Sequence, residues 1–97
     1  MSSISIDYNK AYAEANRLKT AANECDYIIS QIRREIADIH TYWEGAAANE
    51  FLAANEKWCK EMQSIKMELT EISNLIVKVA KEIREADLRA AKAAKNS

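Results

Sequence analysis

The side chains that most often do chemistry in proteins are few and scattered in this sequence. His40 is the only histidine, and neither Cys25 nor Cys59 lies near it at metal-ligand spacing. No nucleophile stands beside a base in a pattern typical of covalent catalysis. A phosphate-binding loop needs several glycines, whereas the chain has only Gly45. The sequence therefore predicts no catalytic site, no metal site and no cofactor, and we interpret the protein as a non-enzyme.

The chain is expected to reverse direction once, at Trp43-Glu44-Gly45. Gly45 is the single glycine, and proline is absent. Glycine leaves a helix through a left-handed backbone conformation at little steric cost, so we interpret Gly45 as the stop of a preceding helix. Trp43 offers a large apolar surface that can cover the end of a groove between two antiparallel helices. The sequence predicts one helical-hairpin domain, residues 1–97, with helices at about 7–42 and 46–93, a turn at 43–45 and a flexible C-terminal end.

Apolar residues recur at alternating steps of three and four along both predicted helices, a seam typical of left-handed supercoiled packing. Ser3, Ser5 and Asp7 are competent N-caps, and we expect the first helix to start near Asp7. The first seam comprises Tyr8, Ala11, Ala15, Leu18, Ala22, Cys25, Ile29, Ile32, Ile36, Ile39 and Trp43. The second comprises Phe51, Asn55, Trp58, Met62, Ile65, Leu69, Ile72, Ile76, Val79, Ile83, Ala86, Ala90 and Ala93.

Both seams are flanked by further apolar residues, so each stripe is wider than one facing helix can cover. These flanking residues are Tyr12, Ile28, Tyr42, Leu52, Cys59, Leu75 and Val77. The pattern predicts an all-α antiparallel two-helix hairpin that pairs with another hairpin into a four-helix bundle. The candidate residues for dimer or core packing are Phe51, Trp58, Ile65, Leu69, Ile72 and Ile76. Asn55 is polar, and we interpret it as fixing register or oligomeric state.

The second helix is expected to outrun the first. At 1.5 Å per residue the two would span about 54 Å and about 72 Å. Counted outward from the turn, the first helix should end opposite residue ~81, so residues 83–97 would have no intrachain partner. That overhang is either disordered or held by another chain. In an antiparallel pair of hairpins, Trp43 and Gly45 of one copy would lie close to Ile83 and Asp87 of the other.

The two cysteines are not expected to form a disulfide. In the predicted hairpin, Cys25 lies about five residues, or ~7.5 Å along the axis, from the level of Cys59. That offset exceeds disulfide geometry. We interpret Cys25 as a small buried apolar residue and Cys59 as a free thiol or an occasional interchain link.

Composition and charge restrict the class of protein further. An apolar share of 48% with 30% charged residues suits helices with one buried and one solvated face. The excess of basic residues in 78–97 is weak and mixed with acidic ones, so no nucleic-acid partner is expected. The first fifteen residues lack the pattern of a cleaved secretory signal. No run approaches the ~18 apolar residues that span a bilayer, so stable membrane insertion is not expected.

The turn motif and its setting resemble the WXG family of early-secreted-antigen-like proteins, which are substrates of bacterial type VII, or ESX-like, secretion systems. The likeness rests on Trp43-Glu44-Gly45 at the middle of a hairpin of about one hundred residues, followed by Ala46, Ala47 and the aromatic Phe51. It covers nearly the whole chain. The resemblance implies a four-helix bundle, formed as a homodimer or as a heterodimer with a related hairpin. It also implies recognition by a membrane-bound FtsK/SpoIIIE-like ATPase, and secretion via the cytoplasm without a cleaved signal peptide.

The resemblance further implies a C-terminal Tyr-x-x-x-Asp/Glu export motif. The matching segment is 83–87, in which Ile83 replaces the tyrosine and Asp87 matches the acid. The candidate secretion and recognition residues are therefore Trp43, Gly45, Ile83 and Asp87. Ile83 also continues the seam, so core packing is its alternative role. The substitution favours export together with a partner that carries the full motif, or a role as the small companion of a larger toxin.

Two classes of function remain open. The first is a secreted or co-secreted protein that acts through helical-bundle interaction and presents a composite export signal. The alternative is a cytosolic helical adaptor or targeting chaperone for a larger secreted toxin. Membrane insertion by amphipathic helices is a weaker third, because the seams indicate protein–protein packing and the charges are mixed.

Overall fold

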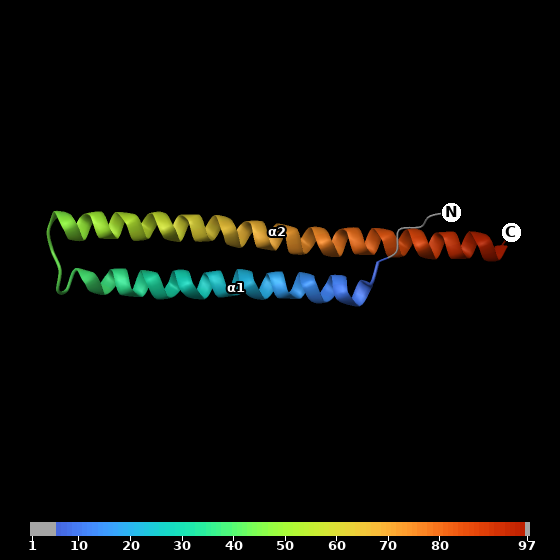
Figure 1. The fold of residues 1–97 in the computed structure, drawn as a ribbon, viewed down its shortest axis with the longest axis horizontal. Coiled ribbons are helices and arrows are strands. Elements are labelled where there is room, and N and C mark those ends of the chain that lie inside the picture. The colour runs from blue at the N-terminus through green and yellow to red at the C-terminus, as the bar shows by residue number, and fades with distance from the viewer. Residues whose placement is uncertain (1–5, 97) are drawn as a thin grey trace.

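The computed structural model describes residues 6–96, which form two long antiparallel helices and the connection between them. α1 spans Tyr8–Ile39 and α2 spans Ala46–Asn96, and α2 continues well past the start of α1 (Figure 1). The 51 residues of α2 account for about 76 Å at 1.5 Å per residue, close to the 78 Å long axis of the molecule. The predicted all-α antiparallel hairpin is confirmed.

Asp7 is the N-cap of α1, as predicted. Its backbone is extended, and its side chain accepts a hydrogen bond from the Lys10 amide at 3.1 Å. This bond satisfies one of the amides that have no partner in the first turn of a helix. Ser3 and Ser5, the other candidate caps, lie outside the described residues.

α1 ends at Ile39, three residues before the predicted end at 42. The Thr41 amide and hydroxyl both donate to the Asp38 carbonyl, at 3.0 and 2.6 Å. The Trp43 amide donates to the Ile39 carbonyl at 2.8 Å. These bonds satisfy the last carbonyls of the helix, so the chain can leave it without buried unpaired groups. The connection therefore comprises residues 40–45 rather than 43–45.

Gly45 starts α2 instead of stopping α1, which corrects the predicted role. Its φ of +108° lies in the left-handed region that favours glycine. Its carbonyl accepts a hydrogen bond from the Asn49 amide at 3.1 Å, opening the helix that begins at Ala46. α2 then runs to Asn96, beyond the predicted end at 93, and the expected flexible C-terminal end is helical to that residue. The cause is an Ala- and Lys-rich sequence of high helix propensity without a glycine or proline stop.

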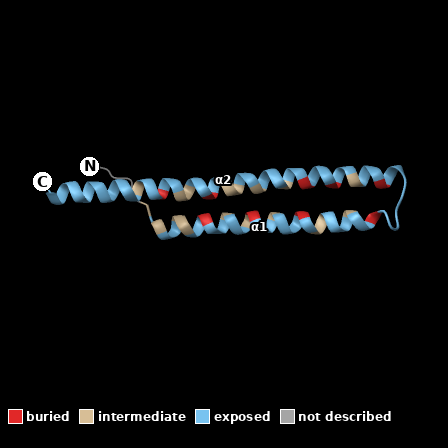
Figure 2. Ribbon diagram, turned by 180° about the vertical axis from the view of Figure 1, so that it is seen from behind, coloured by how far each residue is buried: buried red, intermediate tan, exposed pale blue. Residues whose placement is uncertain are grey.

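The stripe that α1 turns toward α2 is the predicted one. Its buried members, Ala15, Ala22, Ile29 and Ile39, all belong to the predicted seam. Trp43 does not, because it follows the end of the helix and remains 37% exposed. Figure 2 shows the buried residues of both helices facing the contact between them.

The stripe that α2 turns toward α1 is displaced by one residue from the prediction at every other position. This inward stripe comprises buried and half-buried residues, namely Ala48, Leu52, Asn55, Cys59, Met62, Lys66, Leu69, Ser73, Ile76, Ala80 and Ile83. Cys59, Lys66, Ser73 and Ala80 take the places expected for Trp58, Ile65, Ile72 and Val79. Cys59, Ser73 and Ala80 are small, and small residues let two helix backbones approach closely, whereas branched and aromatic ones hold them apart.

Consequently the hairpin has a thin interior. Its largest fully buried side chains are Cys59 and Ser73. The Ser73 hydroxyl donates to the Ala15 carbonyl of the other helix at 2.7 Å, a buried contact that needs close helices. Asn55 is also buried, but its amide donates to the Phe51 carbonyl within α2, at 2.8 Å. Ser73 is therefore a buried polar residue that joins the two helices of the hairpin, whereas the Asn55 hydrogen bond does not cross between them.

Candidate functional site

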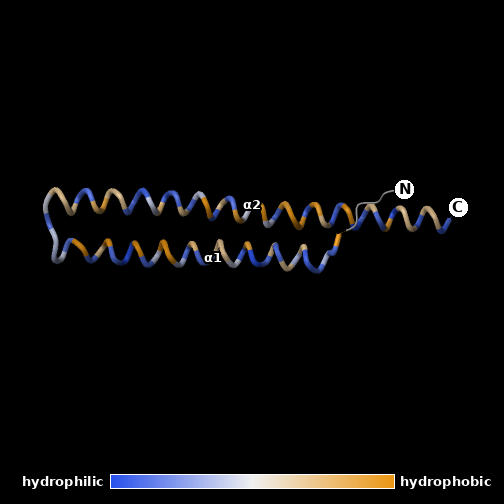
Figure 3. Tube along the Cα trace, viewed as in Figure 1, coloured by the Kyte–Doolittle hydropathy of each residue, from blue (hydrophilic) through white to orange (hydrophobic). Residues whose placement is uncertain are grey.

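Large apolar side chains are exposed in a regular row along α2. Every seventh residue returns to nearly the same angle on a helix, so residues at this spacing form a continuous line. We call this line the apolar row: Phe51, Trp58, Ile65, Ile72 and Val79, which are 43%, 56%, 49%, 48% and 41% exposed. The row lies beside the inward stripe of α2. Figure 3 shows that apolar and polar residues alternate along both helices, as such stripes require.

Of the six residues predicted for dimer or core packing, four belong to this row and two do not. Leu69 and Ile76 are half-buried members of the inward stripe. The other four, in the apolar row, are 43% to 56% exposed. The structure thus separates the candidates into two residues that pack between the helices of the hairpin and four that remain exposed on its surface.

The opposite side of the hairpin is closed by charged pairs. Asp26 of α1 and Lys66 of α2 approach to 2.7 Å, and Arg33 and Glu56 approach to 3.8 Å. Glu56 comes one residue after Asn55 of the inward stripe, and Arg33 comes one residue after Ile32 of the α1 seam. Each member of the apolar row instead comes one residue before a member of the inward stripe. On a helix these offsets point to opposite flanks of the contact. The hairpin therefore has an apolar side, which contains the apolar row, and an ion-paired side.

The turn joins the apolar row at one end of the molecule. The Trp43 ring packs against Phe51, with ring centroids 5.5 Å apart and planes tilted by 41°. Trp43 thus extends the row beyond the start of α2. Gly45 is exposed, and nothing lies within 4 Å of the place where a side chain would begin. Trp43 and Gly45 are both accessible to a partner, and their role in recognition stays a prediction.

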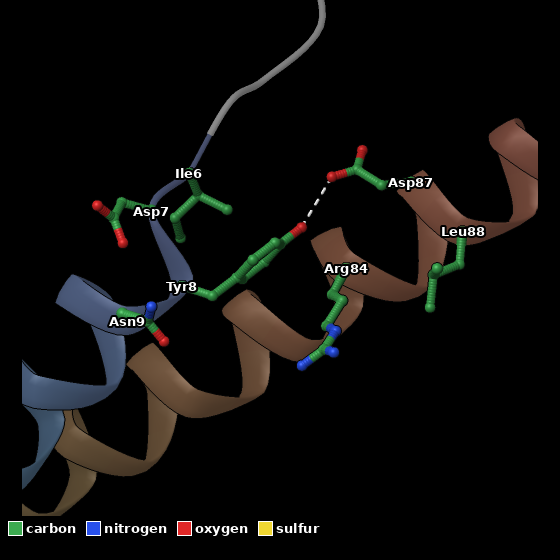
Figure 4. A pocket seen from close by; sticks show the side chains of 7 residues that line it. All are labelled: Ile6, Asp7, Tyr8, Asn9, Arg84, Asp87 and Leu88. Carbon is green, nitrogen blue, oxygen red and sulfur yellow. Dashed lines mark hydrogen bonds between the residues drawn. The ribbon is translucent and has the colours of Figure 1, made fainter.

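The other two candidate recognition residues lie at the far, open end of the hairpin. Ile83 is half-buried on the inward stripe, as its alternative core role predicts. Asp87 accepts a hydrogen bond from the Tyr8 hydroxyl at 2.7 Å (Figure 4). Within one chain, the turn that contains Trp43 and Gly45 thus lies at the opposite end of the hairpin from the part of α2 that pairs with the start of α1 (Figure 1).

Contact between α1 and α2 extends farther than predicted, to Asp87 instead of residue ~81. Helix side chains lean toward the N-terminus of their own helix, and the Tyr8 ring therefore reaches along α2 toward its C-terminal part. The Arg84 guanidinium lies 5.8 Å from the centre of that ring. These three side chains form what we call the Tyr8 clasp, and it reduces the unpartnered part of the predicted overhang.

A shallow hollow surrounds the Tyr8 clasp. It is lined by Ile6, Asp7, Tyr8, Asn9, Arg84, Asp87 and Leu88 (Figure 4). Partial burial and, next, the Asp87 carboxylate raise the pKa of the Tyr8 hydroxyl above its ordinary 10.0, against the opposing influence of Arg84. The phenol therefore keeps its proton, and its role as hydrogen-bond donor, throughout the neutral range. Sequence reasoning missed Tyr8 and Arg84 as members of this site.

The cysteines exchange their predicted roles. Cys59 is fully buried, whereas Cys25 is half-buried. The cause is the displacement of the inward stripe on α2, which brings residue 59 inside in place of residue 58. Both thiols are free, in agreement with the prediction of no disulfide. Cys25 is thus the more accessible thiol.

His40 is an exposed residue at the end of α1. Within the described range, no group of three or more His, Cys, Asp or Glu side chains is placed to hold a metal ion. Neither described helix has an apolar stretch of the length and hydropathy that crossing a membrane requires.

Comparison with known proteins gives one match. A family model described as proteins of 100 residues with WXG matches residues 3–88, which include the whole of α1, the turn and the Tyr8 clasp. No curated protein and no solved structure matches the chain.

Proposed function

Because the chain belongs to the WXG100 family, which is associated with type VII secretion substrates, we propose that it is a small substrate or co-secreted partner of such a system. It acts through helical-bundle interaction and catalyses no reaction. Export proceeds from the cytoplasm without a cleaved signal peptide, through a secretion ATPase of the FtsK/SpoIIIE type.

The observation that carries the proposal is the contrast between a thin interior and an exposed apolar row. Most residues that the hairpin buries are small, Ile29 and Ile39 being the large ones, while Phe51, Trp58 and Ile65 remain about half exposed. The chain exposes 7655 Å², whereas a compact monomer of its mass exposes roughly 5,600 Å². The difference of roughly 2,000 Å² is of the size that an obligate protein interface covers per partner.

A second helical hairpin, either another copy or a related chain, fits this surface. Members of the family pair as helical hairpins. Heptad-spaced large apolar residues suit the knobs-into-holes packing of a four-helix bundle. In an antiparallel arrangement, Trp43 and Gly45 of one hairpin lie near Ile83 and Asp87 of the other. Pairing would thus assemble one composite recognition site at each end of the bundle.

The alternative, an adaptor or targeting chaperone for a larger toxin, uses the same apolar side to cover a client helix. An export assay in the producing cells distinguishes the two. Chain that accumulates in the medium only when the secretion ATPase is present supports the proposal, provided that a cytoplasmic marker stays in the cells. Chain that stays in the cells while a larger bound protein is exported supports the adaptor. Equal release without the ATPase contradicts both.

Trp43 provides the matched test of recognition. Trp43→Ala should reduce export while the helix content, measured by circular dichroism, is retained, because Trp43 lies outside both helices. The control is Tyr42→Ala, which removes a neighbouring aromatic ring that is 73% exposed. Wholesale loss of helix in the Trp43 variant, or equal effects of both changes, would argue against a recognition role.

A further inference from the structure

Residues from both ends of the chain meet in the Tyr8 clasp. Tyr8 and Asp87 are 79 positions apart in sequence, yet their side chains share a hydrogen bond of 2.7 Å. The acceptor is a carboxylate, and hydrogen bonds to charged groups are stronger than those between neutral groups. Figure 4 shows the Tyr8 ring crossing from α1 to α2, with Arg84 and Asp87 on either side of its path. The contact therefore fixes the orientation of Asp87 relative to the start of α1.

The segment of α2 that contains Asp87 lacks an aromatic hydroxyl of its own. Ile83, one turn before Asp87, carries no polar group and is half-buried in the inward stripe. A partner that approaches this end from outside meets Tyr8, Asp87 and the 62% exposed Leu88 instead. The hollow thus presents a phenol, an aliphatic side chain, the Arg84 guanidinium and the carboxylates of Asp7 and Asp87.

We propose that Tyr8 is a positioning residue of the export signal: from α1, it orients Asp87 and supplies the phenol that residues 83–87 lack. This inference rests on the proposed function. The partner is the secretion ATPase, through a surface with an apolar pocket for Leu88 and a hydrogen-bond donor for the Asp87 carboxylate. The signal is then a property of the folded hairpin, because α2 alone does not contain it.

Export in the producing cells tests the inference through matched variants. Tyr8→Ala should lower the exported fraction about tenfold, the change that loss of a charge-assisted hydrogen bond can produce. Tyr8→Phe keeps the ring beside Arg84 and loses the hydroxyl, so an intermediate reduction is expected. The control is Tyr27→Ala on the same helix, where the ring is 66% exposed, and export should be unchanged.

A rescue variant separates positioning from a merely structural role. Adding Ile83→Tyr to Tyr8→Ala returns a phenol to the same end of α2 and should restore at least half of the lost export. Restored stability alone would not explain such a rescue, because Ile83 already packs in the inward stripe. Absence of rescue together with normal export of Tyr8→Phe would overturn the inference.

The clasp itself is testable on the purified protein. Titration of tyrosine absorbance should show a late component above the ordinary phenol range, because partial burial and the Asp87 carboxylate raise the pKa of Tyr8. Tyr8→Phe should remove that late component, and Asp87→Asn should move it toward the others. Four indistinguishable tyrosines would contradict the clasp in solution.

The outcomes distinguish this inference from the proposed function. If the unmodified chain is released equally without the ATPase, the proposed function fails. If its release requires the ATPase and both Tyr8 variants are exported as well as the parent, only the role of Tyr8 fails. If Tyr8→Ala loses helix content, the isosteric Tyr8→Phe variant decides the question alone.

Discussion

The two sides of the hairpin differ in what closes them. On the ion-paired side, Asp26 and Lys66 meet across the helices within the chain. On the apolar side, the apolar row finds no equivalent cover from α1, and its members stay 41% to 56% exposed. One side is therefore closed within a single chain, whereas the other stays open, as the proposed pairing with a second hairpin needs.

The difference follows from where the sequence places its small residues. Ala15, Ala22, Ser73 and Ala80 occupy the contact between the helices, so the backbones lie close together and the interior offers little volume. Large apolar residues beside that contact cannot enter it. Burial of apolar surface is the main favourable contribution to folding, at about 25 cal/mol per Å². The exposed apolar row does not make that contribution within the single hairpin.

The largest expected effect comes from a charge placed on the apolar side. Ile65→Lys should abolish pairing. Each copy loses about 2 kcal/mol of the free energy gained by burying the isoleucine side chain, and it gains an unpaired charge at the interface. The matched control, Ser64→Lys, adds the same charge one residue away on an exposed position. Light scattering should give a smaller particle for the first variant and the parental mass for the second. Equal masses would show that the apolar row is not an interface.

A smaller effect is expected from two opposite substitutions, a large residue placed in the contact between the helices and a small one placed in the apolar row. Ser73→Ile inserts bulk at a fully buried position and removes the hydrogen bond to Ala15, so we expect a loss of about 1–3 kcal/mol in the stability of the hairpin. Ile72→Ser should leave the hairpin contact intact and weaken only pairing. Denaturant unfolding at several protein concentrations separates the two effects. A harmless Ser73→Ile would contradict the close approach of the helices.

Thiol labelling compares the interior with the apolar side directly. Cys25 is half-buried and lies one turn from Ile28, whereas Cys59 is fully buried. We expect alkylation of Cys25 well before Cys59, and slower alkylation of Cys25 once the hairpin is paired. The variants Cys25→Ser and Cys59→Ser assign the two rates. Faster labelling of Cys59 than of Cys25 would mean that Trp58, as the sequence analysis predicts, faces α1 in place of Cys59.

The smallest expected effect is on the ion-paired side. Asp26→Asn should cost no more than about 1 kcal/mol, because the carboxylate is 49% exposed and salt screens such pairs. Glu14→Gln, in the more exposed pair with Arg17, is the control and should cost less. Thermal unfolding in low and high salt measures both. A loss comparable to that of Ser73→Ile would mean that this side contributes more than its exposure indicates.

How far the fold could be predicted differs between the two helices. Along α1, the apolar residues at steps of three and four coincide with the buried stripe, so periodicity identified it correctly. Along α2, two neighbouring stripes share Asn55, Met62, Leu69, Ile76 and Ile83. Periodicity cannot decide between them when both are largely apolar. Close helix packing decides, because it accepts Ser73 and rejects Ile72.

The candidate site was predictable in part for a similar reason. Trp43 and Gly45 are exposed at the turn, which the single glycine of the sequence indicated, and the resemblance to the WXG family named them as recognition residues. Asp87 was named, but its partner Tyr8 was not, since pairing over 79 positions leaves no local signal. The tendency of helix side chains to lean toward their own N-terminus could have suggested that Tyr8 reaches past the level of residue 81.

The most direct test of the central claim is the mass of the purified chain by light scattering, with circular dichroism on the same sample. If the apolar side requires a second hairpin, a chain that pairs with itself should be helical at about twice 11.0 kDa, with a thermal midpoint that rises with concentration. A chain that needs a related partner should be poorly folded or aggregated alone and should become helical on addition of that partner. A stable, fully helical monomer of 11.0 kDa whose unfolding does not depend on concentration would contradict the claim.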